Sequence, residues 1–336
     1  MLKFKIHRLL QSVALAVATL VLLIACNTQP SSTQAPSAKP LVVASSPWPG
    51  FIGHYIAVAK DFFTAEGITV EDRYFQVATD ANTALLSGKV DLGWTGVPDL
   101  ITMTDREPSL KLIMLSDYSN GADGILARGI TDPKELRGKQ IAWEGLPLQA
   151  VLLKKYLQSG GLSEKDVKLL NIPAAEAASA FAAQKVDVAV TYEPWLTKAS
   201  KAGQGQIIFS SKDTNLIADG LAAQAAVLKS RQSDVLAYLR AVDKGVQFAK
   251  SNPQEAAALI AQKLGVTAEE VPALLATVRL FGIQDNQAVA FNPSDRLNVI
   301  DSIKFAAITV PETGSAPKSL DPTTLYDDAL IKQLSP

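Results

Sequence analysis

The chain has 336 residues, of which 48% are hydrophobic and 19% charged, with 32 Lys and Arg against 33 Asp and Glu. Such a composition can bury a large core and excludes an intrinsically disordered chain. The balanced charge provides no basic stretch for phosphate contacts, so we expect no nucleic-acid partner. One Cys and two His exclude disulfide pairs and Cys-rich zinc sites, and we expect neither a metal nor a cofactor.

The first 25 residues have the pattern of an export signal. Basic residues precede a long apolar run, and Leu23-Ile24-Ala25 stands directly before Cys26. These four residues resemble a bacterial lipobox, which implies cleavage before Cys26 and lipidation of that residue. An uncleaved membrane helix is the alternative, but about 17 apolar residues is short for a span. Removal of residues 1–25 takes away three basic residues and no acidic ones, which leaves a net charge of −4.

Residues 26–40 are rich in Ser, Thr, Gln and Pro and have no hydrophobic period. This composition is typical of a flexible tether. We therefore expect a folded body that is anchored by lipid to the extracytoplasmic face of a membrane.

In the folded body, apolar β-type runs alternate with helical periodicity in two series. The first series predicts strands at 41–45, 68–75, 90–93 and 110–115, with helices at 51–66, 79–87 and 98–106. The second predicts strands at 140–143, 167–171 and 186–191, with helices at 148–159, 174–184 and 194–202. This alternation predicts an α/β fold with two lobes, each a mostly parallel sheet with helices on both faces.

After residues 221–228 the pattern is helical, at 233–251, 253–263, 268–280 and 294–307. No third sheet is left for these helices, so we expect them to pack on the first lobe. The chain would then cross between the lobes twice, near 123–128 and near 220–228. The first lobe would comprise residues 41–128 and 220–336, and the second lobe residues 129–219.

Ligands of open α/β sheets bind outside the carboxyl ends of the strands. Five loops leave such ends, at 45–50, 94–97, 117–124, 143–147 and 192–195, and together they hold all four Trp, four acidic residues and no Lys or Arg. The candidate ligand-binding residues in them are Ser46, Trp48, Trp94, Thr95, Asp117, Asp123, Glu144, Glu193 and Trp195.

Several of these residues have a purely structural alternative. Trp48 and Trp94 fit equally between a strand and a helix. Glu144 and Glu193 stand at predicted helix starts, where an acid stabilises the helix dipole. Asp117 and Asp123 flank a Ser-Asn-Gly segment, which is an ordinary turn composition.

Four motifs in this order resemble a known family. They are Asp61-Phe62-Phe63 with Glu66-Gly67-Ile68, Gly88 to Gly93 leading to Pro98, Leu136 to Ala142, and Val186 to Val190 with Glu193-Pro194. The chain resembles the nitrate, taurine and sulfonate group of substrate-binding proteins of ABC importers, whose superfamily includes binders of thiamine pyrimidine precursors. The resemblance implies a type II periplasmic-binding-protein fold, with two crossover strands joining lobes that close over a solute. It also implies a monomer that delivers the solute to a membrane permease and its ATPase, without catalysis.

The loops depart from the anion-binding pattern of that family, because Glu144 stands where anion binders carry small hydroxyl residues. A carboxylate in a buried site favours a cation over an anion, and Trp faces attract cations. The chain is similar to members associated with guanidine and urea, so we expect a guanidine-like cation first and a neutral amide such as urea second. Taurine or another sulfonate, nitrate, a thiamine precursor, and a sensory role for the receptor are the alternatives.

Overall fold

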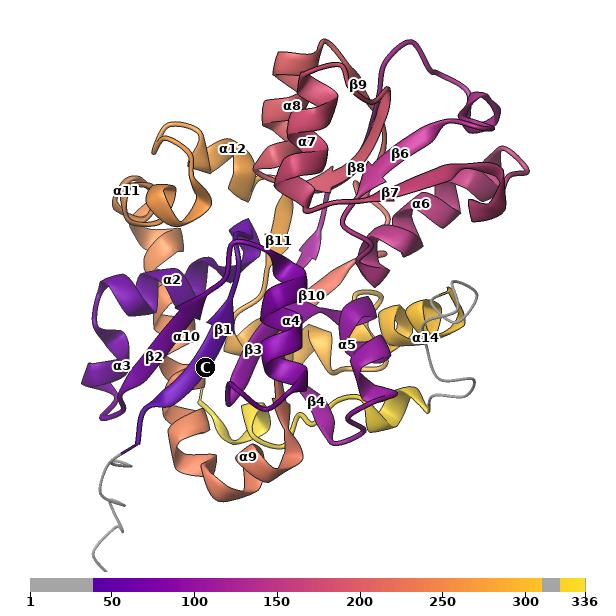
Figure 1. The fold of residues 1–336 in the computed structure, drawn as a ribbon. Coiled ribbons are helices and arrows are strands. Elements are labelled where there is room, and N and C mark those ends of the chain that lie inside the picture. The colour runs from indigo at the N-terminus through magenta and orange to yellow at the C-terminus, as the bar shows by residue number, and fades with distance from the viewer. Residues whose placement is uncertain (1–38, 310–320, 336) are drawn as a thin grey trace, which may run out of the picture. The chain divides into compact units, whose positions relative to one another are not determined.

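The computed structural model describes residues 39–309 and 321–335. The predicted export signal, Cys26 and most of the predicted tether lie outside these residues. Two mixed β-sheets organise the described chain (Figure 1). No helix within the described ranges is long and apolar enough to cross a membrane.

The first sheet has the strand order β11-β4-β10-β3-β1-β2. Strand β1 pairs in parallel with β2 and β3, whereas β10 runs antiparallel between β3 and β4, and β11 runs antiparallel to β4. The strands are β1 (Leu41–Ser45), β2 (Val70–Tyr74), β3 (Leu92–Gly96), β4 (Leu110–Ser119), β10 (Ala218–Gln224) and β11 (Val278–Leu280).

The second sheet has the strand order β7-β6-β8-β5-β9. Its strands β6, β7 and β8 are parallel, and β5 runs antiparallel between β8 and β9. The strands are β5 (Asp123–Ala127), β6 (Gln140–Trp143), β7 (Lys168–Asn171), β8 (Val188–Tyr192) and β9 (Gln206–Ser210).

The predicted two-lobed α/β fold is confirmed, with one difference in how each sheet is built. Each sheet contains one strand that the chain enters directly after passing over from the other sheet. This strand, β10 in the first sheet and β5 in the second, runs antiparallel to both of its neighbours. The crossings lie at residues 119–123 and 210–218, earlier than the sequence indicates. Strand β5 therefore belongs to the second sheet, although the predicted first lobe extended to residue 128. Only a short turn separates β4 from β5. A pattern in which strands alternate with helices does not predict two strands that follow each other directly.

The helices cover both faces of the first sheet. Figure 1 shows α2 and α10 on one side and α4 and α5 on the other. Among the later helices, α10 packs against α2 and α14 against α5. The helices are α2 (Ile52–Ala59), α3 (Phe62–Ala65), α4 (Ala78–Leu86), α5 (Val97–Thr104), α6 (Pro147–Ser159), α7 (Ala174–Ala182), α8 (Trp195–Gly203), α9 (Ala225–Ser230), α10 (Gln232–Ser251), α11 (Pro253–Leu264), α12 (Val271–Leu275), α13 (Ile283–Asp285) and α14 (Val299–Thr309).

Two predicted helices are interrupted. The helix predicted at 51–66 is divided into α2 and α3, because Asp61 adopts a left-handed conformation with φ of 55°. The helix predicted at 268–280 ends early and its last residues form β11, which pairs with β4. Helical periodicity in the sequence predicts neither the break at Asp61 nor the pairing of residues 278–280 with the edge of β4.

A buried asparagine completes the edge of β4 beyond the residues that pair with β11. The side chain of Asn286 accepts the backbone N–H of Leu115 at 2.7 Å and donates to the carbonyls of Leu115 at 2.8 Å and Gly282 at 2.9 Å. It is fully buried, so no water replaces these bonds.

We predict that Asn286→Ala lowers the free energy of unfolding by about 2–4 kcal/mol, because it leaves buried backbone groups of Leu115 without partners. Urea unfolding followed by circular dichroism measures the change. The control is Asn292→Ala, whose side chain also bonds only backbone groups but near the surface. Equal losses for the two variants would contradict the importance of the buried position.

Candidate functional site

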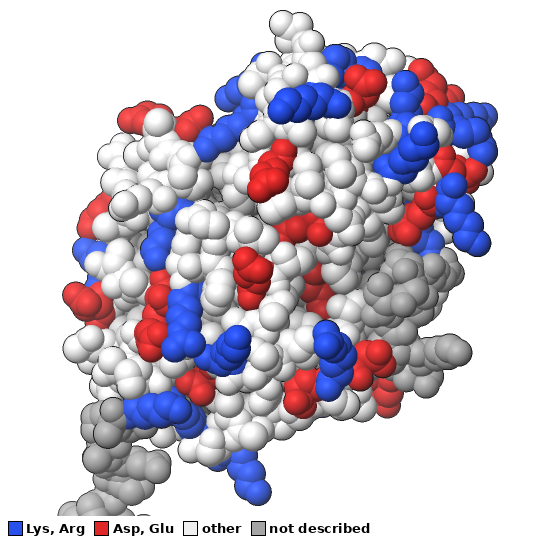
Figure 2. All heavy atoms as spheres, viewed as in Figure 1, with Lys and Arg blue, Asp and Glu red and all other residues white. Residues whose placement is uncertain are grey.

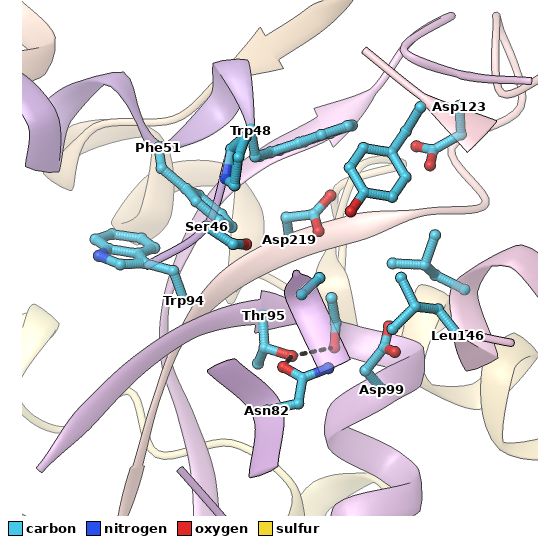
Figure 3. Close-up of a pocket in the computed structure, with 15 residues that line it drawn as sticks. Ser46, Trp48, Phe51, Asn82, Trp94, Thr95, Asp99, Asp123, Leu146 and Asp219 are labelled. Carbon is cyan, nitrogen blue, oxygen red and sulfur yellow. Dashed lines mark hydrogen bonds between the residues drawn. The ribbon is translucent and has the colours of Figure 1, made fainter. Parts of the chain in front are cut away.

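A hollow of about 410 Å³ is lined by residues that follow strands of both sheets (Figure 3). Five of the predicted residues line it: Ser46, Trp48, Trp94, Thr95 and Asp123. The loop after β1 carries the first two, β3 carries the next two, and β5 begins at Asp123. The carboxyl-end loops of the strands thus meet here, as the sequence predicts.

Aromatic rings form one side of the hollow. The Trp48 Nε1–H donates to both carboxylate oxygens of Asp117, at 3.0 and 3.2 Å, which fixes the ring. Asp117 therefore lies behind Trp48 and does not line the hollow. Trp94 donates through Nε1 to the hydroxyl of Tyr238 at 2.9 Å, and its ring lies 5.3 Å from that of Phe51, measured between centroids.

Glu193 and Trp195, both predicted to contact ligand, do not line the hollow. The Glu193 carboxylate accepts the backbone N–H of Thr197 at 3.2 Å and its hydroxyl at 2.5 Å, within the first turn of α8. The Trp195 ring packs edge-on behind Tyr192, with 5.0 Å between centroids. The helix-start alternative thus describes Glu193, and Tyr192 is the aromatic residue of this loop that reaches the hollow.

Glu144 also lies outside the hollow, where it joins segments of the two sheets. Its Oε1 accepts the backbone N–H and the hydroxyl of Thr79 in α4, both at 3.0 Å. Its Oε2 accepts the backbone N–H of Ala174 in α7 at 3.2 Å and the hydroxyl of Tyr192 at 3.3 Å. One carboxylate therefore caps the first turns of two helices that belong to different sheets.

Sequence reasoning missed two acids that line the hollow, Asp99 in the first turn of α5 and Asp219 on β10. With Asp123 they form an acidic trio, each only 2 to 4% exposed and each with at least one carboxylate oxygen that has no hydrogen-bond partner. Figure 3 shows the three carboxyl groups around the same space. The sequence signal that could have indicated Asp219 is an acidic residue in a mostly apolar strand.

Burial raises the pKa values of the acidic trio and of Asp117. It raises the pKa of Asp123 to about 7, and it raises that of Asp117 to about 7 despite hydrogen bonds from Ser116 and Trp48. Burial, and next the Glu144 carboxylate, holds the pKa of Asp99 well above its usual 3.8. Burial, and next the Asp117 carboxylate, does the same for Asp219. Desolvation without a compensating cation is the common cause.

No Lys, Arg or His is among the described residues that line the hollow. Within residues 39–309 and 321–335, no group of three His, Cys, Asp or Glu residues has a spacing suited to a metal ion. On the molecular face in Figure 2, acidic and basic side chains are interspersed. The hollow therefore offers carboxylates and indole rings to a molecule with positive charge or N–H donors.

Comparison with known proteins identifies the family. The pattern of the family described as NMT1/THI5 like matches residues 48–256. The chain belongs to this family. It is 28% identical over 276 residues to the riboflavin-binding protein RibY of Chloroflexus aurantiacus, an alignment that covers 74% of this chain and 76% of that protein.

A provisionally named aliphatic sulfonates-binding protein of Bacillus subtilis is 29% identical over 204 residues, which cover 60% of this chain and only 61% of that protein. Among solved structures, the periplasmic aliphatic sulphonate binding protein SsuA of Escherichia coli superposes with a TM-score of 0.71 at 19% identity, over 87% of this chain and 93% of that one. This likeness confirms the predicted periplasmic-binding-protein fold. The guanidine-like solute stays a prediction, since none of these names mentions one.

We predict that Glu144→Ala lowers the free energy of unfolding by about 1–3 kcal/mol and increases the radius of gyration, because it removes the caps that join α4 to α7. Small-angle X-ray scattering and urea unfolding measure the two effects. The control is Glu135→Ala, since Glu135 accepts backbone N–H groups only from Thr131 and Asp132 beside it. An unchanged radius for Glu144→Ala would show that the carboxylate does not hold the segments together.

Proposed function

We propose that this protein is the extracytoplasmic solute-binding component of an ABC importer, and that its solute is a small planar cation of the guanidine type. Membership of the NMT1/THI5-like family supports a solute-binding role. The periplasmic-binding-protein fold, with a hollow lined from both sheets, supports capture between two lobes. A lipid anchor at Cys26, a permease and an ATPase as partners, a monomeric state and the absence of catalysis belong to the same proposal.

The observation that carries the proposed solute class is the acidic trio. Asp99, Asp123 and Asp219 each keep a buried oxygen without a donor, and no basic residue among the described lining residues balances them. A guanidinium ion presents planar N–H groups that pair with carboxylates through two parallel hydrogen bonds. It thereby supplies both the donors and the positive charge that the hollow lacks.

The aromatic side of the hollow supports the same class. Trp48 is held by Asp117, and its ring meets Tyr192 edge-on at 6.0 Å between centroids. The face of an indole ring attracts a cation with about 0.5–2 kcal/mol, depending on how far the pair is removed from water. A planar cation can therefore contact a ring on one side and carboxylates at its edge.

A neutral amide such as urea is the second candidate, because it offers N–H donors without the charge. Sulfonates are suggested by the names of relatives, and taurine, nitrate and a thiamine pyrimidine precursor by the family that the sequence resembles. An anionic group in this hollow would be repelled by every member of the acidic trio that is ionised, in a medium of low dielectric. A receptor that signals instead of feeding a permease would use the same hollow.

A thermal-shift screen of guanidinium, urea, taurine and nitrate tests the solute class, since a ligand stabilises the folded state that binds it. Millimolar concentrations are far below those at which guanidinium or urea denatures proteins. We expect the largest rise in melting temperature with guanidinium. If the melting temperature rises only with taurine or nitrate, the solute is not a guanidine-type cation and the proposed solute class is wrong.

The acidic trio is tested by Asp123→Asn, which keeps the shape and removes the charge. We predict that guanidinium binds this variant at least about tenfold more weakly, a loss of about 1.4 kcal/mol in calorimetric titration. The control is Asp213→Asn, which makes the same change of charge at an exposed position. Unchanged affinity for Asp123→Asn would remove that residue from the site.

A further inference from the structure

Two members of the acidic trio lie close to each other, Asp99 in α5 and Asp219 on β10 of the first sheet. A Cβ atom placed on Gly96 would be 2.7 Å from Asp99 Oδ2 and 3.5 Å from Asp219 Oδ1, so these oxygens are at most 6.2 Å apart. A side chain at position 96 would clash with Asp99, whereas the Asp219 oxygen would lie at ordinary contact distance from it. Both residues are buried and both retain oxygens without a hydrogen-bond partner.

The charged and titratable groups that face this pair come from four further elements. Asp117 on β4 and Asp123 on β5 act on Asp219, while Asp123 and Glu144, in the loop after β6, act on Asp99. Tyr192 on β8 also lies within range of Asp99. The backbone of Leu148 in α6 opposes them in part by favouring ionised Asp99. No described lining residue carries a positive charge.

Such a pair is costly to ionise completely. Two buried carboxylates that share a site without a cation titrate as a unit, and one of them keeps its proton to a pH well above the usual range. Burial is the main cause of the raised pKa values of Asp99 and Asp219, and the Asp99 carboxylate adds to the rise for Asp219 after those of Asp117 and Asp123. A solute that brings its own positive charge would make the proton unnecessary.

We propose that Asp99 and Asp219 hold a proton in the empty hollow and release it to water when the cationic solute binds, so that capture exchanges a proton for a cation. This inference rests on the proposed function and adds a second, exchangeable ligand to the site. The protein–proton complex and the solute cation give the protein–solute complex and a free proton, so charge balances without any other reactant. A neutral amide would leave the proton in place.

The exchange makes affinity depend on pH in a defined direction. If one proton leaves for each cation that binds, affinity for guanidinium increases by up to about tenfold per pH unit, and the increase ends once the pair is ionised. The stored proton also affects the empty protein. Because the folded state binds it more tightly than the unfolded state, stability contributed by the pair is present at low pH and is lost as pH rises through the raised pKa.

The proton store is tested without any solute. Carbon-13 NMR of the aspartate carboxyl groups, recorded from pH 4 to pH 9 on the ligand-free protein, follows each titration. We expect at least one carboxyl group to stay protonated at pH 7, and Asp219→Asn or Asp99→Asn to abolish or shift that titration. Asp213→Asn, at an exposed position, should leave it unchanged. Wild-type aspartates that all titrate below pH 5 would overturn the proposal.

Release is tested by calorimetric titration with guanidinium chloride at pH 7 in two buffers of different ionisation enthalpy. We expect the heat to differ between buffers by the amount for about one proton, and Asp219→Asn to remove most of that difference. Binding of guanidinium with no buffer dependence would overturn the exchange while leaving the proposed function intact. Absence of binding together with a carboxyl group protonated at pH 7 would overturn guanidinium as the solute and leave the proton store intact.

Discussion

Three carboxyl groups in one hollow, each with a buried oxygen that no donor reaches, set the conditions under which this protein can hold a molecule. Removing a carboxylate from water costs several kcal/mol unless a positive charge or hydrogen bonds compensate. The described chain supplies no basic side chain at this position, and it keeps the oxygens unpaired although neutral donors such as Thr95 and Asn82 line the same space. The compensation must come from outside, as a proton or as a solute.

The two-sheet architecture explains how this arrangement arises. The first sheet contributes Asp99, Asp219 and the tryptophans, and the second contributes Asp123 and Tyr192, so neither sheet forms the hollow alone. The segments before and after the two crossings carry several of the acids, which places the charge where the lobes join. In the proposed function, a solute that neutralises the charge would contact both lobes at once, which would link binding to closure.

Much of this could be predicted from the sequence, and the remainder depended on pairing and packing in three dimensions. Alternating apolar runs predicted the lobes and the loops that meet at the hollow, but not the antiparallel strand β5, which follows β4 without a helix. Trp48 and Asp123, which the sequence selects because they follow strand ends, line the hollow. Glu193 does not line the hollow and bonds Thr197 instead, since a helix-start acid and a ligand-binding acid have the same local pattern. The sequence does not single out Asp219, because an isolated acid in a strand does not reveal that Asp99, in a helix far away in the sequence, lies beside it.

We propose that the hollow accepts positive charge or N–H donors and rejects oxyanions. A crystal structure of the complex with the solute that stabilises the protein most tests it directly. We expect nitrogen atoms of the solute within hydrogen-bonding distance, about 2.7–3.2 Å, of the carboxylates of Asp99, Asp123 and Asp219. A sulfonate, nitrate or other oxyanion in that position, or a Lys or Arg side chain turned into the hollow, would contradict the claim.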